Sequence, residues 1–406
     1  MLKRQLFDDV ISHLTAREVT VIAGPRQAGK TTLLKQVDQY IKDRGDYAVM
    51  LTLEDPAILS KLNNHPENIF DFLLKGESRR TYVLIDEIQY LTDPSNFLKL
   101  LYDKHAESLK LVVTGSSAFY IDLKFKDSLA GRKRIFELYT LSFEEMLIFR
   151  TGKEDFSKEL SAMRTQPGYR PAAYNEIRSL FNEYLTYGGY PAVVLAADPN
   201  EKLLILKEML NSFVKRDIRE SRINDPDKFY QMMLLLAHHT GSLVNMSELS
   251  LTLKLTTAAV ENYIYVLRKC YHISLLKPFH GNIRKELTKM PKAYFHDLGL
   301  RNILMNQFNP VFQRIDRGEL AENYAFIRLW QMHTGENLFF WRTADGNEID
   351  FIVRNPDGTG EAIEIKYNDA LFHSGKYKVF PDKYPGYTVS VRSIETDDPL
   401  RELMRI

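Results

Sequence analysis

Residues 24–31 of the chain are Gly24-Pro25-Arg26-Gln27-Ala28-Gly29-Lys30-Thr31, which fits the phosphate-binding P-loop pattern at every fixed position. An apolar segment, residues 19–23, precedes this stretch, and a helical pattern follows it. In that context the glycines let successive backbone N–H groups point at phosphate oxygens, and the helix adds the positive end of its dipole. The sequence therefore predicts a nucleotide-binding loop between a strand and a helix, and the alternative of an accidental glycine-rich turn is disfavoured.

The residues of this loop have separate expected roles. We expect Lys30 to reach the β- and γ-phosphates of ATP, and the Thr31 hydroxyl to complete the shell of a Mg²⁺ ion. The predicted nucleotide-binding set consists of Gly24, Pro25, Arg26, Gln27, Ala28, Gly29, Lys30, Thr31, Thr32 and Asp86.

A second motif, Tyr82-Val83-Leu84-Ile85-Asp86-Glu87, is an apolar strand that ends in two acids, as expected of a Walker B partner. Asp86 is predicted to hold the Mg²⁺ shell together with Thr31. Glu87 is predicted to orient and deprotonate the attacking water, which hydrolysis needs and passive nucleotide binding does not. Acids at a strand end also serve as helix caps, but beside a P-loop this pair favours an ATPase.

Two further catalytic contributions are expected from polar positions after the predicted strands. In Thr114-Gly115-Ser116-Ser117, Ser116 could sense the γ-phosphate or position water, or the segment could cap a helix. Arg132 and Arg134 are candidates for an arginine finger, which accelerates phosphoryl transfer by roughly 10³–10⁵. A solvated basic loop is an equal alternative for these arginines, and a finger that acts in trans requires a homo-oligomer, such as a ring.

Composition limits the class of protein. The chain has 406 residues, enough for two or three domains, and its net charge of +1 gives no global reason to expect a polyanion partner. A single cysteine, Cys270, excludes an internal disulfide framework. No apolar run approaches the roughly 20 residues of a membrane helix, and acids interrupt the N-terminal segment where a signal peptide is apolar. We therefore expect a cytoplasmic protein without a membrane partner.

The pattern along the chain predicts several domains. Strands at 19–23, 47–53, 82–85 and 109–114 alternate with helical stretches, which is typical of an α/β parallel sheet with helices on both faces. Helical periodicity dominates residues 141–216, with a polar insertion at 151–173. Residues 246–279 suit a winged helix-turn-helix or an ordinary helical subdomain, and a helix at 319–332 precedes strands at 338–342, 348–353 and 362–367.

The last of these segments carry a second group of titratable residues. Alternation along a strand puts Glu364 and Lys366 on one face, near Asp350 of the preceding strand, and Glu322 of the helix could join them. Such a group could hold a second Mg²⁺ or Mn²⁺ ion and activate water for phosphodiester cleavage. The spacing alone equally suits a solvated strand face.

The motifs together resemble those of the prokaryotic AAA-type ATPases fused to a restriction-endonuclease-like domain. The resemblance rests on the P-loop and on the stretches 86–89, 115–117, 129–132, 187–191, 321–323, 340–343, 348–351 and 363–366. It implies an AAA-type P-loop core at 1–140, a helical lid at 141–235, a winged helix at 236–300 and a restriction-endonuclease-like domain of the PD-(D/E)xK type at 301–406. No Pro-Asp pair precedes Asp350, which departs from that pattern.

Three functions follow as hypotheses. The first is Mg²⁺-dependent ATP hydrolysis that drives a conformational switch or motor acting on DNA. The alternatives are an ATP-regulated metal-dependent nuclease and a protein-remodelling or signalling ATPase in which the C-terminal domains are interaction scaffolds. Action on DNA predicts one basic face made by Arg268, Lys269, Lys277, Arg284 and Lys285.

Overall fold

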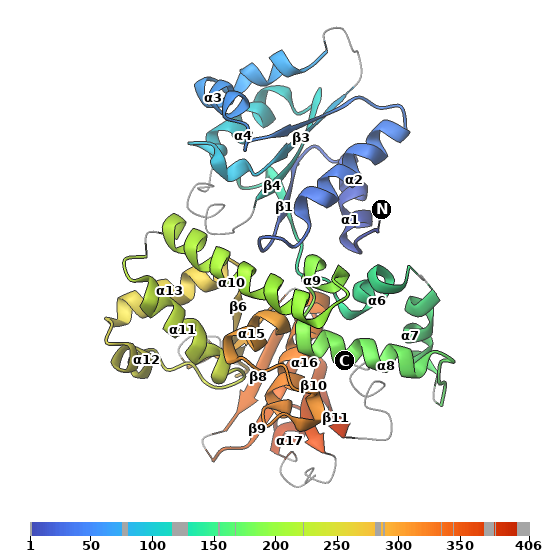
Figure 1. The fold of residues 1–406 in the computed structure, drawn as a ribbon, viewed down its shortest axis with the longest axis vertical. Coiled ribbons are helices and arrows are strands. Elements are labelled where there is room, and N and C mark those ends of the chain that lie inside the picture. The colour runs from blue at the N-terminus through green and yellow to red at the C-terminus, as the bar shows by residue number, and fades with distance from the viewer. Residues whose placement is uncertain are drawn as a thin grey trace. The chain divides into compact units, whose positions relative to one another are not determined.

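The structure is a computed structural model that describes residues 2–74, 80–115, 129–152, 155–166, 168–221, 223–280, 286, 289–333, 335–343, 345–368, 377 and 379–395 (Figure 1). The chain divides into two compact units, here called the N-terminal unit (residues 1–141 with 269–271) and the C-terminal unit (142–268 with 272–406). Each unit is described separately. The finer division into four domains stays a prediction.

The N-terminal unit is built on a parallel sheet of five strands in the order β2-β3-β4-β1-β5. These strands are β1 (Val19–Ala23), β2 (Ala48–Thr52), β3 (Thr81–Asp86), β4 (Leu109–Gly115) and β5 (Lys133–Glu137). All four strand pairs are parallel, which confirms the predicted α/β core. The sequence predicted only four of the strands, because β5 is an edge strand on which Arg134, Ile135 and Glu137 face solvent and no apolar run marks it.

Helices cover both faces of this sheet. They are α1 (Leu6–Ser12), α2 (Lys30–Asp43), α3 (Pro56–Asn64) and α4 (Pro94–His105), with short 3₁₀ turns at His13–Thr15, Pro66–Phe72 and Ile88–Tyr90. Alternation along β1 separates two cores: Ile22 packs with Leu33 and Val37 of α2, whereas Val21 packs with Leu98 of α4. Because side chains on both faces are apolar, the sheet is buried as parallel sheets require.

The C-terminal unit contains eleven described helices, of which α6 to α13 precede its first strand. They are α6 (Phe143–Thr151), α7 (Asp155–Thr165), α8 (Tyr174–Tyr187), α9 (Pro191–Leu195), α10 (Pro199–Ser221), α11 (Pro226–His238), α12 (Met246–Leu253), α13 (Thr257–Lys269), α15 (Leu298–Met305), α16 (Arg317–His333) and α17 (Val379–Lys383). The Gly-Gly pair after α8 packs against the start of α15. A Cβ on Gly188, at φ +75°, would lie 2.4 Å from Asp297 Oδ1, and the Gly189 N–H donates to Asp297 Oδ2 over 2.8 Å. Asp297 is also the N-cap of α15, so the glycines let α8 end against that cap.

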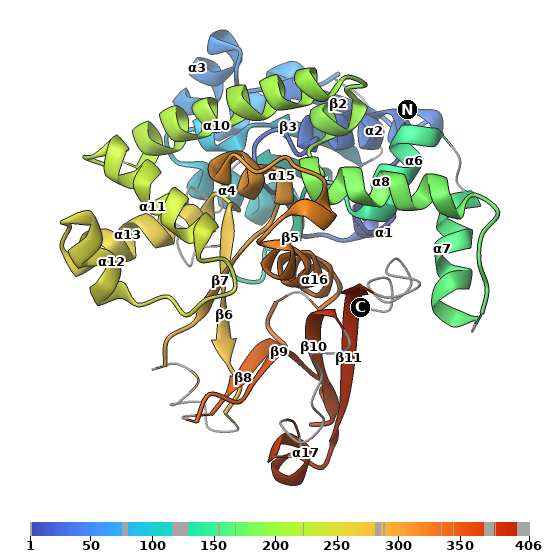
Figure 2. The same ribbon diagram turned by 60° about the horizontal axis from the view of Figure 1, so that its bottom comes forward.

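A mixed sheet completes this unit, with six strands in the order β11-β10-β9-β8-β6-β7. They are β6 (Ile273–Pro278), β7 (Lys292–Phe295), β8 (Leu338–Arg342), β9 (Glu348–Arg354), β10 (Gly360–Asn368) and β11 (Tyr387–Glu395). The segments expected of a winged helix are present as α12, α13 and the antiparallel pair β6 and β7. However, β6 also pairs in parallel with β8, so one sheet crosses the expected boundary at residue 300 (Figure 2). The winged helix and the restriction-endonuclease-like fold stay predictions.

Apolar side chains from several strands of this sheet and from α17 form one core. Phe279 follows β6 and packs with Phe339 and Trp341 of β8, Ile352 of β9 and Phe380 of α17.

No helix among the residues that the structure describes is long and apolar enough to cross a membrane.

Candidate functional site

The P-loop lies where the sequence predicted it, between β1 and α2 at the carboxyl edge of the parallel sheet. Gly29 is the N-cap of α2 and has φ 98°, a left-handed conformation that glycine adopts without strain. Gly24 has no room for a side chain, because a Cβ there would lie 2.0 Å from the Leu138 carbonyl oxygen. The two glycines thus allow the loop to turn tightly against the end of β5.

Lys30 is buried and points into the loop. Its Nζ donates hydrogen bonds to the carbonyl oxygens of Gly24, over 3.0 Å, and of Pro25, over 2.8 Å. Burial lowers the pKa of Lys30 to about 8, although the carboxylate of Glu87 opposes this shift. The amine is therefore held inside the curve of the loop, where a phosphate group is expected.

Thr31, Asp86 and Thr114 form a connected group below the loop. The Thr31 hydroxyl donates to Asp86 Oδ2 over 2.8 Å, and the Thr114 hydroxyl donates to Asp86 Oδ1. Thr114 Oγ1 in turn accepts from the Glu87 backbone N–H over 3.0 Å. Strand register explains this group, since β1, β3 and β4 are neighbours whose carboxyl ends meet at one edge.

Glu87 adopts an unusual backbone conformation directly after β3. Its φ of 59° and ψ of 51° lie in the left-handed region, which costs a residue with a side chain about 1–3 kcal/mol. The Gln89 side-chain amide donates to Glu87 Oε2. The carboxylate is thus oriented by Gln89, and the strained backbone is of the kind that clusters at functional sites.

Arg4 is a residue of this site that the sequence did not indicate. Its buried guanidinium donates to the carbonyl oxygens of Ala28 in the P-loop, over 2.7 Å, and of Tyr139, over 2.8 Å. It therefore ties the P-loop to the segment after β5. No sequence pattern could have revealed it, because one partner is 24 and the other 135 residues away.

Of the remaining residues that the sequence predicted for the nucleotide site, only some lie at the P-loop. Within the loop, Gln27 has φ 61° and Arg26 lowers the pKa of Lys30 through its charge, whereas Thr32 is exposed on the first turn of α2. Ser116 lies outside the described residues. Within the expected segment 114–117, Thr114 is the residue whose hydroxyl contacts Asp86, two residues before Ser116.

The two candidate arginine fingers lie at the opposite edge of the sheet from the P-loop. Val19, the first residue of β1, is paired with Lys133, and its N–H donates to the Arg132 carbonyl oxygen. The Arg132 guanidinium is paired with Asp103 of α4, over 2.7 Å, and Arg134 stacks on Phe136. Both arginines therefore lie toward the amino end of β1, whereas the P-loop follows its carboxyl end. A role as an arginine finger stays a prediction, and this placement favours one in trans.

The expected C-terminal group does come together in the C-terminal unit. Asp350 of β9 accepts from the Ile365 backbone N–H over 2.8 Å, and Lys366 of β10 pairs with Glu364. Burial raises the pKa of Asp350 well above its usual value, and the charges of Glu322 and Glu364 add to that effect. The four side chains named from the sequence thus influence one another.

Lys292 of β7 is the residue that the sequence did not associate with this group. Its Nζ, almost fully buried, lies 2.5 Å from Glu348 Oε1, 3.0 Å from Glu322 Oε1 and 3.6 Å from Asp350 Oδ1. Burial opposes the charge of Lys292, but Glu322 and the neighbouring acids outweigh burial and raise its pKa well above the usual value. Lys292 therefore serves as an internal counter-ion among the acids Glu322, Glu348 and Asp350.

This arrangement does not fit a second metal ion. Within the described parts of the chain, no group of three or more histidine, cysteine or acidic side chains is arranged to hold a metal. Glu364 Oε2 is buried without a hydrogen-bond partner, but the ammonium group of Lys292 occupies the space between the other carboxylates. By contrast, Thr31 and Asp86 offer a hydroxyl and a carboxylate oxygen that fit Mg²⁺. The P-loop beside them leaves no room for a Cβ on Gly24, which suits a loop that wraps closely around a nucleotide phosphate.

The five expected DNA-binding cations are less informative. Arg268 and Lys277 are exposed and Lys269 is half-buried, whereas Arg284 and Lys285 lie outside the described residues. Arg268 lines a hollow together with Glu261, so the described part of this surface carries both signs of charge.

Comparison with known families agrees with the site geometry. Residues 16–147 match the family described as an AAA domain. Residues 178–310 match a domain of unknown function (DUF8612), and residues 317–394 match another (DUF4143). The first match, with the P-loop and the parallel sheet, supports an AAA-type ATPase domain that binds nucleotide, and its family suggests hydrolysis.

Relatives extend over most of the chain. An uncharacterized protein of Methanocaldococcus jannaschii is 25% identical over 368 residues, which is 88% of this chain and 77% of the relative. An uncharacterized protein of Haemophilus influenzae is 26% identical over 364 residues, covering 87% and 82% of the two chains. The similarity to these relatives therefore extends over most of this chain and most of theirs.

Among solved structures, the Thermotoga maritima RuvB Holliday junction branch migration motor has a TM-score of 0.29 at 15% identity, covering 67% of this chain and 89% of RuvB. The replication initiator DnaA bound to AMPPCP and single-stranded DNA has a TM-score of 0.30 at 15% identity, covering 65% and 86%. Scores of this size do not establish a shared arrangement of whole chains.

Proposed function

We propose that this chain hydrolyses ATP with Mg²⁺ and uses the change of nucleotide state to drive a conformational switch or motor that acts on DNA. The observation that carries the proposal is the contact between Thr31 and Asp86 beneath the P-loop, with Glu87 as the next residue. A hydroxyl and a carboxylate at that position are the usual protein ligands of nucleotide-bound Mg²⁺.

Each residue of the site has a defined part in this proposal. Lys30 would pair with the β- and γ-phosphates, and Thr31 and Asp86 would hold Mg²⁺, which supplies positive charge to the phosphate oxygens. Glu87, oriented by Gln89, would accept a proton from the attacking water.

Thr114 offers a route from the site to the rest of the sheet. Its hydroxyl contacts the Asp86 carboxylate and the Glu87 backbone at once. A displacement of Asp86 when the phosphate leaves would therefore also move the backbone at Glu87 and at the end of β4. A conformational switch would start from this end of β4.

The test of this proposal is steady-state phosphate release together with nucleotide binding. We expect Lys30→Ala to lose nucleotide binding, and Glu87→Gln to retain binding while losing turnover. Glu107→Gln is the matched control, because Glu107 is a largely exposed glutamate whose loss should change neither property. Normal hydrolysis by Glu87→Gln would remove Glu87 from the catalytic role.

The action on DNA has its own test. DNA affinity should fall steeply as salt rises, because contacts to phosphate release counter-ions. Arg268→Glu and Lys277→Glu should weaken binding if the α13 and β6 surface carries it. An affinity that ignores salt would favour the alternative of a protein-remodelling or signalling ATPase.

Cleavage by the C-terminal unit is the second candidate; Asp350, Glu364 and Lys366 lie together as it requires, but Lys292 occupies the place of a metal ion between the carboxylates. Plasmid DNA would be incubated with Mg²⁺ or Mn²⁺, with and without ATP. Activity that disappears in both Asp350→Ala and Lys366→Ala would support an ATP-regulated nuclease. Equal cleavage by the wild type and both variants would point to contamination.

A further inference from the structure

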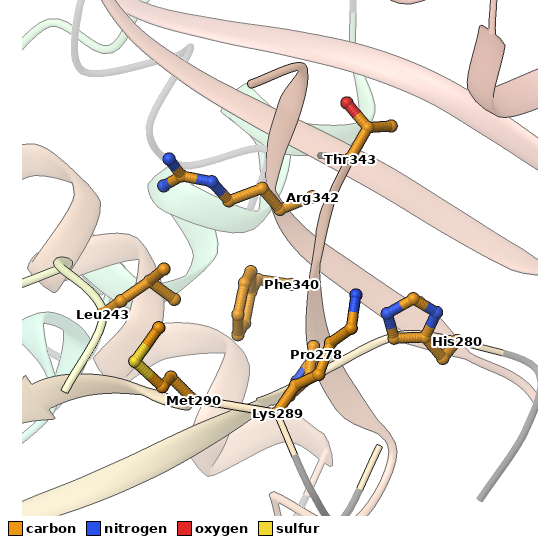
Figure 3. A pocket seen from close by; sticks show the side chains of 8 residues that line it. All are labelled: Leu243, Pro278, His280, Lys289, Met290, Phe340, Arg342 and Thr343. Atoms are coloured by element: carbon orange, nitrogen blue, oxygen red, sulfur yellow. The ribbon is translucent and has the colours of Figure 1, made fainter. Parts of the chain in front are cut away.

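A pocket of about 440 Å³ lies in the C-terminal unit, outside the sites described so far. It is formed where β6 and β8 end, next to the segment that leads into β7. Its lining residues are Leu243, Pro278, His280, Lys289, Met290, Phe340, Arg342 and Thr343 (Figure 3). Because β6 and β8 are parallel, their carboxyl ends meet here, which is the edge at which parallel strands commonly bind ligands.

The lining combines cations with apolar surface. Lys289 and Arg342 are exposed at the pocket, and His280 adds a third group that can carry positive charge. Among the described residues that line the pocket, none is acidic. Met290, with 45% of its surface exposed, and Leu243 present apolar contacts on one side of Phe340 (Figure 3).

One of these cations, Arg342, is held in place by a neighbouring carboxylate. Arg342 donates to Glu348 over 3.0 Å, and Glu348 also contacts Lys292. Lys292 in turn lies 5.5 Å from the ring centre of Phe340, at the base of the pocket. The guanidinium of Arg342 is therefore positioned before any ligand arrives, which lowers the entropic cost of binding an anion.

We propose that this pocket binds a nucleoside phosphate, as one nucleotide unit of a single nucleic-acid strand. The volume lies within the range of about 300–1,000 Å³ that is usual for ligand pockets. A base would pack on Met290 and Leu243, while Lys289 and Arg342 would pair with phosphate oxygens. A purely apolar ligand would make no use of these cations, and a bare anion would make no use of the apolar wall.

This inference rests on the proposed action on nucleic acid and names the surface that contacts the strand, but it does not depend on ATP hydrolysis. The test is the anisotropy of a short labelled oligothymidylate with the full chain, measured over a range of salt. It is repeated in a Lys30→Ala background, so that a failure of the ATPase proposal does not affect the result.

Lys289→Glu should weaken binding on the order of tenfold and lower the salt slope by about one, because one phosphate contact is lost. Met290→Ala should weaken binding several-fold without changing the salt slope, because it removes apolar contact only. The matched control is Lys207→Glu, which makes the same charge change at an exposed position of α10. Equal thermal melting of all variants would show that they fold alike.

Unlabelled thymidine monophosphate is added as a competitor. Displacement only by oligonucleotide supports a strand as the source of the nucleotide unit. Displacement by the mononucleotide at similar concentration supports the same chemistry with a free nucleotide as ligand. If Lys289→Glu and Met290→Ala bind as Lys207→Glu does, or if binding ignores salt, the pocket is not the contact and the inference is overturned.

Discussion

At the scale of single residues, the buried environment of the Lys30 amine has a clear consequence for the pH dependence of ATP binding. Burial lowers its pKa to about 8, so the free protein begins to lose this charge slightly above neutral pH. Since the charged amine is the form that pairs with phosphate, and bound phosphate favours that form, protons and ATP bind cooperatively.

ATP affinity should therefore fall as pH rises through about 8, approaching about tenfold per pH unit above it. Equilibrium binding of a fluorescent ATP analogue between neutral and alkaline pH would measure the slope. Lys30→Arg, whose guanidinium keeps its charge over this range, should flatten it. A wild-type affinity that is constant across the range would show that the Lys30 charge is not coupled to binding.

Gly24 gives a second prediction at this scale. In Gly24→Ala the new Cβ would lie 2.0 Å from the Leu138 carbonyl oxygen, a backbone atom that cannot rotate away. We expect a loss of about 1–3 kcal/mol in the free energy of unfolding, together with loss of nucleotide binding. Chemical denaturation and ATP binding would be measured for this variant and for the control Gly318→Ala. A Cβ on Gly318 would meet no heavy atom within 4 Å other than those of its chain neighbours and its own helix backbone. If Gly24→Ala is as stable as this control and binds ATP equally well, the P-loop can shift to accommodate the added methyl group.

At the scale of secondary-structure elements, Lys292 joins β7 to α16 and β9 through three carboxylates. Removing one partner of a buried ionic group leaves the others uncompensated, so Lys292→Met should cost about 3–5 kcal/mol at neutral pH. Without the ammonium group the carboxyl pKa values rise, and the folded state binds more protons than the unfolded state. The stability of the variant should therefore fall as pH rises from about 4 to 7.

Urea denaturation at several pH values would measure this effect. Lys277→Met on the neighbouring strand β6 is the control, because Lys277 is exposed and its loss should cost little. Equal stability of the two variants at neutral pH would show that Lys292 is not needed as a counter-ion.

The elements also show what the sequence could and could not predict. Strands with continuous apolar runs, such as β1 and β4, were predicted within about a residue of their observed ends. β5 was missed because its mostly exposed residues resemble a basic loop, and β11 because no motif marks it. Asp350, Glu364 and Lys366 are close in sequence and were grouped correctly, whereas Lys292 and Arg4 act through contacts with distant segments that no local pattern records.

At the scale of the whole molecule, Arg132 and Arg134 lie away from the P-loop of their own chain. This placement raises the question whether several copies of the chain assemble when ATP binds. If either arginine completes the site of a neighbouring copy, ATP should promote oligomers. Mass measurement with a non-hydrolysable ATP analogue should then show species larger than a monomer, and Lys30→Ala should abolish them. A monomer under both conditions would exclude a finger in trans.

A mixing experiment would identify the arginine. Arg132→Ala or Arg134→Ala keeps its own Glu87, while Glu87→Gln keeps its arginines, so neither variant alone should turn over normally. A mixture should regain phosphate release, because the arginine of one copy can serve the P-loop of another, and a finger is worth roughly 10³–10⁵ in rate. Unchanged turnover in Arg132→Ala and Arg134→Ala alone would remove both from catalysis.

The pairing of β6 with β8 also decides how this protein can be divided. A fragment that starts at residue 301 would lack β6 and β7, expose the edge of β8 and lose the Lys292 that balances its acids. Open sheet edges of this kind favour aggregation. A division that leaves this sheet intact must therefore fall before Ile273, so that β6 and β7 stay with the C-terminal strands and not with α12 and α13.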